Sequence, residues 1–596
     1  MNRALAIIGI VLLLPACSLS PTRVQQVDAT VEKAREGALT CPAENRDACS
    51  ENSPLLALAE EDVRTGSHHV TLLETGEDAL KIRIHLARAA KRSIDMQNFI
   101  LRRDDSGELL LNELVNAARR GVRVRLLLDQ MFTVSDLKYL VKLTMAHANF
   151  EIRFYNPSFH KAQTNNHDWI SGVACCFRRF NQRMHNKLLL VDELVGVIGG
   201  RNLADRYFDY DTSYDFKDRD VAVFGITGQE MRAYFELFWA GKKSVPVQHL
   251  RDVARELLNG ASTQLEAYHP PARMLPLLEQ ITHEQHIRDL FIDPSFKVEK
   301  LAYYSDLPRK IARAEDDIEK DVTPELLKVL LEARRSVVIQ SPYMVLSRQV
   351  RELFRDLRLR NPAIELVFST NSLASTDADT VYANTHKHKK RYVEKLGFRM
   401  HEFKPFPLDA PEFFPRWPQL LAEKARGITS NSVVTGDNST IPMPAPRVGL
   451  HAKSFVVDGQ VAMIGSHNFD PRSEGFNTEN GLIVWDAAFA RALEANIRRD
   501  IEPRNSWVVA MKPDDTTSAR HHHESNGNFI PKYDSHFYGS TSVFELIPGK
   551  KPVPPGSTDF YQNHYSVGSF PEVIKTRRQI NVLFLGSFFG FLEPIL

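Results

Sequence analysis

The stretch His185-Asn186-Lys187-Leu188-Leu189-Leu190-Val191-Asp192, with Gly199-Gly200-Arg201-Asn202 after it, recurs as His451-Ala452-Lys453-Ser454-Phe455-Val456-Val457-Asp458, with Gly465-Ser466-His467-Asn468 after it. Both copies read H-x-K-x4-D-x6-G-[GS]-x-N. One match could arise by chance in a chain of 596 residues, but two matches at equivalent places are highly specific. The pattern therefore indicates a duplicated unit that carries one functional element in each copy.

The apolar residues between each lysine and aspartate predict a short strand. Residues two apart in a strand project from the same face, so His185 and Lys187 point the same way. The same holds for His451 and Lys453 in the second copy. Each histidine–lysine pair can therefore be aimed at one bound group.

The end of each motif is predicted to be a hairpin. Asp458-Gly459 is a strong turn signal, and Asp192 occupies the matching place in the first copy. Both aspartates belong to the catalytic motif, but they lie away from the histidine–lysine face. We expect them to be structural, either holding the hairpin or pairing with a buried cation.

The returning strand of each copy ends at a glycine, which lets backbone approach a ligand closely. Asn202 and Asn468 follow it and are expected to offer amide donors to phosphate oxygens. Ser466 stands between the second glycine and its asparagine and is expected to support the site.

Other segments repeat in the same order in both halves of the chain. Residues 91–97 resemble 334–340, and residues 150–155 resemble 398–403, with helical periodicity between them. Alternating strands and helices indicate α/β units, and the repeat is too long for a solenoid. The expected fold is therefore α/β, with two duplicated lobes that each contain a mixed β-sheet flanked by helices.

Two histidines and two lysines suit phosphoryl transfer without a metal or other cofactor. The lysines supply positive charge, one histidine can attack phosphorus, and the other can protonate the leaving alcohol. Each histidine needs an orienting carboxylate. Asp220 and Glu479 lie downstream of the two motifs at similar distances and are the candidates.

The paired motif resembles that of the phospholipase D superfamily. In the second half, Gly465 to Ser473 and Asn477 to Leu482 look like the C-type bacterial cardiolipin synthases. The resemblance covers roughly residues 70 to 510 and the last turn, 588–596. It departs at Asn98, where an aromatic residue is expected, and in the polar insertions after Arg520.

The resemblance implies one composite active site at the interface of two phospholipase D-like lobes. It also implies a phosphohistidine intermediate, with His185 as the nucleophile and His451 as the general acid and base. The implied partners are phospholipid substrates and a membrane surface, and an accessory protein is a further candidate partner.

The N-terminal segment has the form of an export signal. Arg3 precedes an apolar run from Ala4 to Leu14, and Leu14-Pro15-Ala16-Cys17 resembles a bacterial lipobox. We expect Cys17 to be lipidated, which would tether the protein in the cell envelope facing the periplasm, on the inner or the outer membrane. Plain secretion and a membrane-spanning anchor are the alternatives, and a Cys41–Cys49 disulfide is as consistent with the sequence as free thiols.

These patterns divide the chain into six parts. The expected parts are a lipoprotein signal peptide (1–16), a tether (17–65), a first lobe (66–275), a connecting segment (276–325), a second lobe (326–510) and a C-terminal extension that packs on the lobes (511–596).

The composition separates the possible functions further. The 75 basic residues nearly balance the 74 acidic ones, whereas nucleic-acid binders usually carry a basic excess. No nucleic acid is therefore expected as a partner, and a phosphodiesterase acting on it is disfavoured. Phosphatidyl transfer is preferred, with a hydrolytic phospholipase D releasing phosphatidic acid as the alternative. A non-catalytic lipid-binding scaffold is disfavoured because both motifs are intact.

Overall fold

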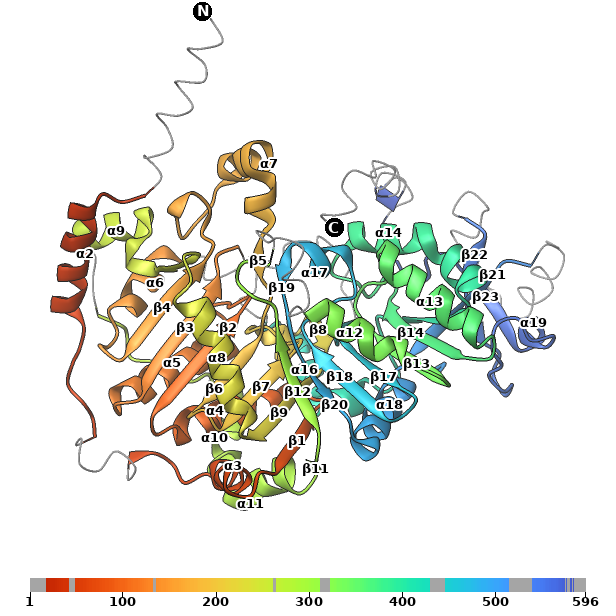
Figure 1. The fold of residues 1–596 in the computed structure, drawn as a ribbon, viewed down its shortest axis with the longest axis horizontal. Helices are drawn as coiled ribbons and strands as arrows, with labels where there is room; N and C mark the ends of the chain where they lie inside the picture. The colour runs from red at the N-terminus through yellow and green to blue at the C-terminus, as the bar shows by residue number, and fades with distance from the viewer. Residues whose placement is uncertain are drawn as a thin grey trace, which may run out of the picture.

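A computed structural model shows two lobes side by side, each with a central sheet covered by helices (Figure 1). The structure describes residues 18–41, 49–131, 136–260, 264–310, 322–428, 445–513 and 539–573, together with 575, 579–580 and 583. The predicted signal peptide 1–16 and Cys17 lie outside these residues.

The first lobe contains a nine-stranded mixed sheet in the order β10-β4-β3-β2-β6-β7-β9-β1-β11. Three of its strands are parallel: β2 (Ser93–Asn98), β3 (Arg123–Asp129) and β4 (Phe150–Tyr155). The others pair antiparallel: β1 (His68–Leu73), β6 (Leu188–Val191), β7 (Val195–Gly199), β9 (Asp220–Gly225), β10 (Ser244–Pro246) and β11 (Phe296–Val298). The main helices are α4 (Gly76–Ala89), α5 (Asp105–Arg119), α6 (Leu137–Thr144), α8 (Thr227–Trp239) and α9 (Arg251–Leu258).

The second lobe repeats this plan in a ten-stranded sheet, ordered β12-β20-β18-β17-β13-β14-β15-β21-β22-β23. Its parallel strands are β13 (Ser336–Gln340), β14 (Glu365–Asn371) and β15 (Phe398–Phe403). The antiparallel ones are β12 (Leu301–Ser305), β17 (Ser454–Val457), β18 (Val461–Gly465), β20 (Asn480–Val484), β21 (Ser506–Met511), β22 (Thr541–Leu546) and β23 (His564–Gly568). Helices α12 (Val322–Leu331), α13 (Arg348–Arg360), α14 (Asp379–Lys390), α16 (Trp417–Ala425) and α18 (Ala487–Asp500) accompany it. The predicted α/β fold with two duplicated lobes is confirmed.

Both faces of β6 are buried, which explains why its four residues are all apolar. Leu189 and Val191 pack into the core of the first lobe. Leu188 and Leu190 face a second core that also contains Val456 of the other lobe. The strand that carries the first motif therefore lies between the lobe's own core and an apolar layer shared by the two lobes.

The prediction that residues 17–65 form a tether is wrong where this segment folds into two helices that pack on the first lobe. α2 (Pro21–Ala34) buries Val27 and Val31, and α3 (Pro54–Thr65) buries Leu55 and Ala59, all in the core of the first lobe. Each helix begins with a serine cap followed by proline. Two apolar residues four apart attach α2 to the core, and Leu55, Leu56 and Ala59 attach α3, but so few residues produce little periodicity in a polar segment.

The connecting segment and the C-terminal extension both contribute strands. β11 forms an edge of the first sheet and β12 an edge of the second, while β22 and β23 extend the second sheet at its other edge. Disulfides join Cys41 to Cys49 and Cys175 to Cys176. Within the described residues, no helix combines the length and apolarity needed to cross a bilayer.

Candidate active site

Two short strand pairs connect the lobes directly in front of the motifs. β5 (Arg183–Met184) pairs with β19 (Asn477–Thr478), and β16 (Arg447–Leu450) pairs with β8 (Tyr214–Lys217). In both pairs, the strand that enters the motif of one lobe runs parallel to a strand of the other lobe. The residue that follows the partner strand therefore lies beside the histidine of the other lobe: Glu479 after β19, and Asp218 after β8.

This exchange determines which carboxylate orients which histidine. His185 Nδ1 lies 2.8 Å from Glu479 Oε2, and the His185 backbone N–H donates to the Thr478 carbonyl at 2.9 Å. His451 Nδ1 lies 2.6 Å from Asp218 Oδ2, and its backbone N–H donates to the Lys217 carbonyl at 2.8 Å. Each ring is thus held through Nδ1 by the acid of the other lobe.

The prediction for Asp220 is wrong. Its carboxylate accepts a hydrogen bond from Arg83 at 2.8 Å and lies 3.5 Å from Arg201, both within the first lobe. Asp220 already belongs to β9, whereas Asp218 lies between β8 and β9.

Asp218 is the functional residue that the sequence reasoning missed. Each orienting acid stands three residues before the first apolar side chain of the strand that follows: Asp218 before Val221, and Glu479 before Leu482. Aligning the two copies on these strands would have identified it. Glu479 is at the site as expected, but it faces His185 rather than the histidine of its own lobe.

The two acids are supported differently. Glu479 accepts hydrogen bonds from the hydroxyls of Ser466 at 2.5 Å and Ser473 at 2.8 Å. Asp218 sits against Gly200, where an added Cβ would lie 2.1 Å from its Oδ1. Ser466 of one motif therefore donates to Glu479, whereas Gly200 at the equivalent place in the other motif leaves room for Asp218.

Both motif lysines are buried beside their histidines. Lys187 Nζ donates to the His185 carbonyl at 2.8 Å, and Lys453 Nζ lies 3.2 Å from His451 Nε2. Burial lowers the pKa of Lys187 to about 7 and that of Lys453 to about 8. A bound phosphate would stabilise their charged forms, so these lysines form a site that favours an anion.

The histidines are also shifted. Burial and the charges of Lys187 and Lys453 hold the pKa of His185 well below its usual value. Burial and Lys453 lower the pKa of His451 too, although Asp218 opposes the shift. Burial opposes ionisation of Asp218, but His451 and Lys453 outweigh it and hold the Asp218 pKa well below its usual range.

Aromatic rings surround both imidazoles. Phe99 packs edge-on against His185 with 5.0 Å between centroids. Tyr207 and Phe216 pack against His451 at 5.1 and 4.9 Å. These rings reduce the access of water to each histidine and restrict its orientation.

The two motif asparagines have different surroundings. Asn202 donates from Nδ2 to the Tyr207 hydroxyl at 2.9 Å and accepts from the Ile100 N–H at 3.2 Å, so it also holds a loop. The buried Asn468 Oδ1 has no hydrogen-bond partner among the described residues. The side chain of Asn468 is therefore less engaged in the protein's own hydrogen bonds than that of Asn202.

Asp192 and Asp458 both accept backbone hydrogen bonds, which favours the first of their two expected structural roles. Asp192 accepts three backbone N–H groups, from Lys91, Arg92 and Ser93, at 2.7–2.9 Å. Asp458 accepts the matching three, from residues 334–336, at 2.7–3.0 Å. Both have positive φ, as their hairpins require. They join the hairpin of the motif to the beginning of the adjacent antiparallel strand, β2 in the first lobe and β13 in the second.

The family model described as "Cardiolipin synthase, PLD-like domain" matches residues 83–239 and 326–501, one segment in each lobe. The chain belongs to the phospholipase D superfamily. It is an enzyme of the phospholipase D type within the cardiolipin synthase-like group.

The chain is also similar to individual proteins. Cardiolipin synthase C of Escherichia coli (strain K12) is 31% identical over 71% of this chain and 82% of its own. An uncharacterized protein of Helicobacter pylori (strain ATCC 700392 / 26695) is 31% identical over 77% and 84%. Among solved structures, a phosphatidylserine synthase of Haemophilus influenzae Rd KW20 aligns with a TM-score of 0.47 and 12% identity, covering 76% of this chain and 91% of that one.

Proposed function

We propose that the protein transfers phosphatidyl groups between membrane phospholipids and alcohols, as a cardiolipin synthase does, through a phosphohistidine intermediate. The observation that carries the proposal is the cross-lobe pairing of His185 with Glu479 and of His451 with Asp218, beside two buried lysines. This arrangement provides a nucleophile, a proton carrier and an anion site in one place.

In the first step, His185 Nε2 attacks phosphorus, forming a P–N bond while the bond from phosphorus to the leaving oxygen breaks. His451 gives its proton to the departing alcohol. In the second step, His451 takes a proton from the acceptor alcohol, whose oxygen attacks phosphorus and releases His185. Lys187 and Lys453 neutralise charge on the non-bridging oxygens in both steps.

The surroundings of the histidines support this division of roles. The low pKa of His185 keeps its ring neutral and able to attack. Glu479 already accepts two serine hydroxyls, which makes it a weaker acceptor for His185. Asp218 remains an anion against His451 and therefore stabilises the imidazolium that a proton carrier must form.

The proposal is tested by a lipid product assay. Purified protein is mixed with vesicles of phosphatidylglycerol and phosphatidylethanolamine, and the products are identified by mass spectrometry. Cardiolipin that disappears in His451→Ala is the expected result. Phosphatidic acid as the only product would favour the hydrolytic alternative, and no lipid turnover would overturn the proposal.

The proposed location is the cell envelope, with Cys17 lipidated and the enzyme facing the periplasm. The first described residue, Ser18, lies directly after Cys17 at the surface of the first lobe. Radiolabelled palmitate incorporated by the natural chain but not by Cys17→Ser would support the anchor. Equal labelling of both would refute it.

A further inference from the structure

α7 (Asn166–Asn181) projects from the upper edge of the first lobe in Figure 1. Its side chains are mostly exposed, and three of them are large and apolar: Ile170 is 68% exposed, Val173 48% and Trp169 37%. At about 100° per residue these three lie within roughly one quarter to one third of the helix circumference. They form an apolar patch on a helix that has no covering element there among the described residues.

The lower part of α7 packs against its upper part. The helix bends at Cys176, and Phe180 returns beneath Gly172, whose added Cβ would lie 2.4 Å from the ring. Phe180 also packs edge-on against Trp169 with 5.0 Å between centroids. The exposed patch is therefore held on a defined support.

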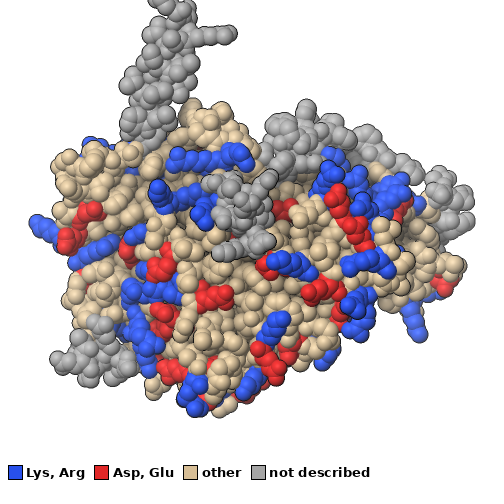
Figure 2. All heavy atoms as spheres, in the orientation of Figure 1, with Lys and Arg blue, Asp and Glu red and all other residues tan. Residues whose placement is uncertain are grey.

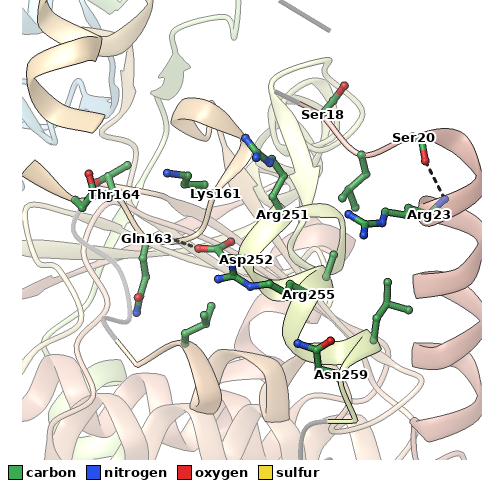
Figure 3. A pocket seen from close by; sticks show the side chains of 15 residues that line it. Ser18, Ser20, Arg23, Lys161, Gln163, Thr164, Arg251, Asp252, Arg255 and Asn259 are labelled. Atoms are coloured by element: carbon green, nitrogen blue, oxygen red, sulfur yellow. Dashed lines mark hydrogen bonds between the residues drawn. The ribbon is translucent and has the colours of Figure 1, made fainter. Parts of the chain in front are cut away.

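A basic hollow of about 920 Å³ adjoins the beginning of α7. It lies between the start of α2, α9 and the loop that leads into α7, and its cations are Arg23, Lys161, Arg251 and Arg255 (Figure 3). Ser18, the residue after the predicted lipidation site, lies on its wall.

Lys161 is paired with Asp168 at 2.9 Å, but the charge of the arginines is not neutralised by the single carboxylate of the hollow. Asp252 accepts the backbone N–H groups of Ala162 and Gln163 at 2.8–3.0 Å. Within the described part of the chain, Arg251 and Arg255 form no ion pair. Figure 2 shows Lys and Arg side chains gathered near this upper edge of the first lobe.

We propose that α7 and the basic hollow together form a docking face for an anionic phospholipid bilayer. Trp169, Ile170 and Val173 enter the interfacial region, and the arginines contact headgroup phosphates. Tryptophan favours this depth because its ring is amphipathic. The proposal rests on the proposed function in that it names the surface from which the same active site takes its substrate.

Docking at α7 would bring the active site close to the lipid. The helix leads through β5 directly to His185. Phe177 of α7 packs edge-on against Phe476, which precedes β19 and Glu479. The helix is thus in contact with both segments that position the His185–Glu479 pair, so a lipid held at α7 lies next to the entrance strands of the site.

Tryptophan quenching tests the insertion directly. The full chain, Trp169→Phe and the double variant Trp169→Phe/Leu359→Trp are mixed with vesicles containing phosphatidylglycerol and acyl-chain-brominated phosphatidylcholine. Leu359 is 74% exposed on α13 of the other lobe and serves as the matched control. We expect brominated lipid to reduce the emission of the natural chain more than that of Trp169→Phe, and the Leu359→Trp change to add no further loss. Equal losses in the natural chain and Trp169→Phe would overturn the proposal.

Kinetics separate docking from chemistry. Ile170→Ser/Val173→Ser should raise the KM for vesicular phosphatidylglycerol about tenfold, equivalent to about 1.4 kcal/mol. It should leave turnover of monomeric short-chain phosphatidylglycerol unchanged, and Leu359→Ser should change neither. An unchanged vesicle KM would overturn the docking face. Absence of turnover in the natural chain would instead overturn the proposed function, and the quenching result would still decide on docking.

Discussion

Because each histidine is oriented by an acid of the other lobe, we expect Asp218→Asn to reduce the catalytic rate strongly. The Asp218 carboxylate is fully buried, and its Oδ2 lies 2.6 Å from His451 Nδ1. An amide there no longer stabilises an imidazolium, and it can hold the ring in the wrong tautomer. A buried aspartate–histidine pair in serine proteases loses about 10⁴-fold in kcat on the same change. We therefore expect a loss of about 10⁴-fold here, or about 5.4 kcal/mol in the activation barrier.

Asp220→Asn is the matched control because it is two residues away and equally buried. Its carboxylate pairs with Arg83 at 2.8 Å, away from His451, so its loss should reduce stability by about 3–5 kcal/mol and leave the chemistry intact. Cardiolipin formation from phosphatidylglycerol vesicles would be measured at a temperature where circular dichroism shows both variants folded. The reasoning is refuted if Asp218→Asn keeps a tenth of the natural rate, or if folded Asp220→Asn loses as much as Asp218→Asn.

Three further predictions follow from the site and the core. In the proposed mechanism the charged forms of Lys187 and Lys453 bind phosphate, and the pKa values of these lysines are about 7 and 8. We therefore expect kcat/KM to fall as pH rises through this range. A pH profile in which Lys187→Arg does not extend the alkaline limb would contradict this. Asp192→Ala leaves three backbone N–H groups without their acceptor. Urea denaturation should show a free energy of unfolding lower by about 2–4 kcal/mol, while the folded fraction keeps its turnover. An inactive but equally stable variant would argue for a catalytic carboxylate. Leu55→Ala in α3 should lower the free energy of unfolding by about 2–5 kcal/mol because Leu55 is fully buried in the first-lobe core. Val63→Ala, on the exposed side of the same helix, should lower it little. Equal, small effects of both on the melting temperature would show that residues 54–65 behave as a tether.

Much of the fold could be read from the chain because its signals are local. Alternation within the motif strands places His185 and Lys187 on one face, and Asp458-Gly459 marks a hairpin, whatever the rest of the molecule does. Duplication of these local signals was enough to predict two mixed-sheet lobes. The same reasoning predicted a structural role for Asp192 and Asp458.

The helices α2 and α3 were missed for a physical reason. A helix that packs on an existing core through two residues, such as Val27 and Val31, needs little apolar periodicity of its own. Its stability comes from the tertiary contact, because short isolated helices are marginal in water. The polar composition of residues 18–65 therefore reflects the exposed faces of α2 and α3 and does not reveal that their other faces are buried.

The sequence by itself predicted the residues to which we assign the chemistry: two histidines, two lysines and one of the two orienting acids, Glu479. Only the tertiary structure decided which acid serves which histidine. β5 pairs with β19, and β16 with β8, across about half of the chain, and the hydrogen bonds of such pairs leave no mark on the local pattern of either strand. For that reason Asp218 of one lobe orients His451 of the other, and spacing along the chain pointed to Asp220 instead.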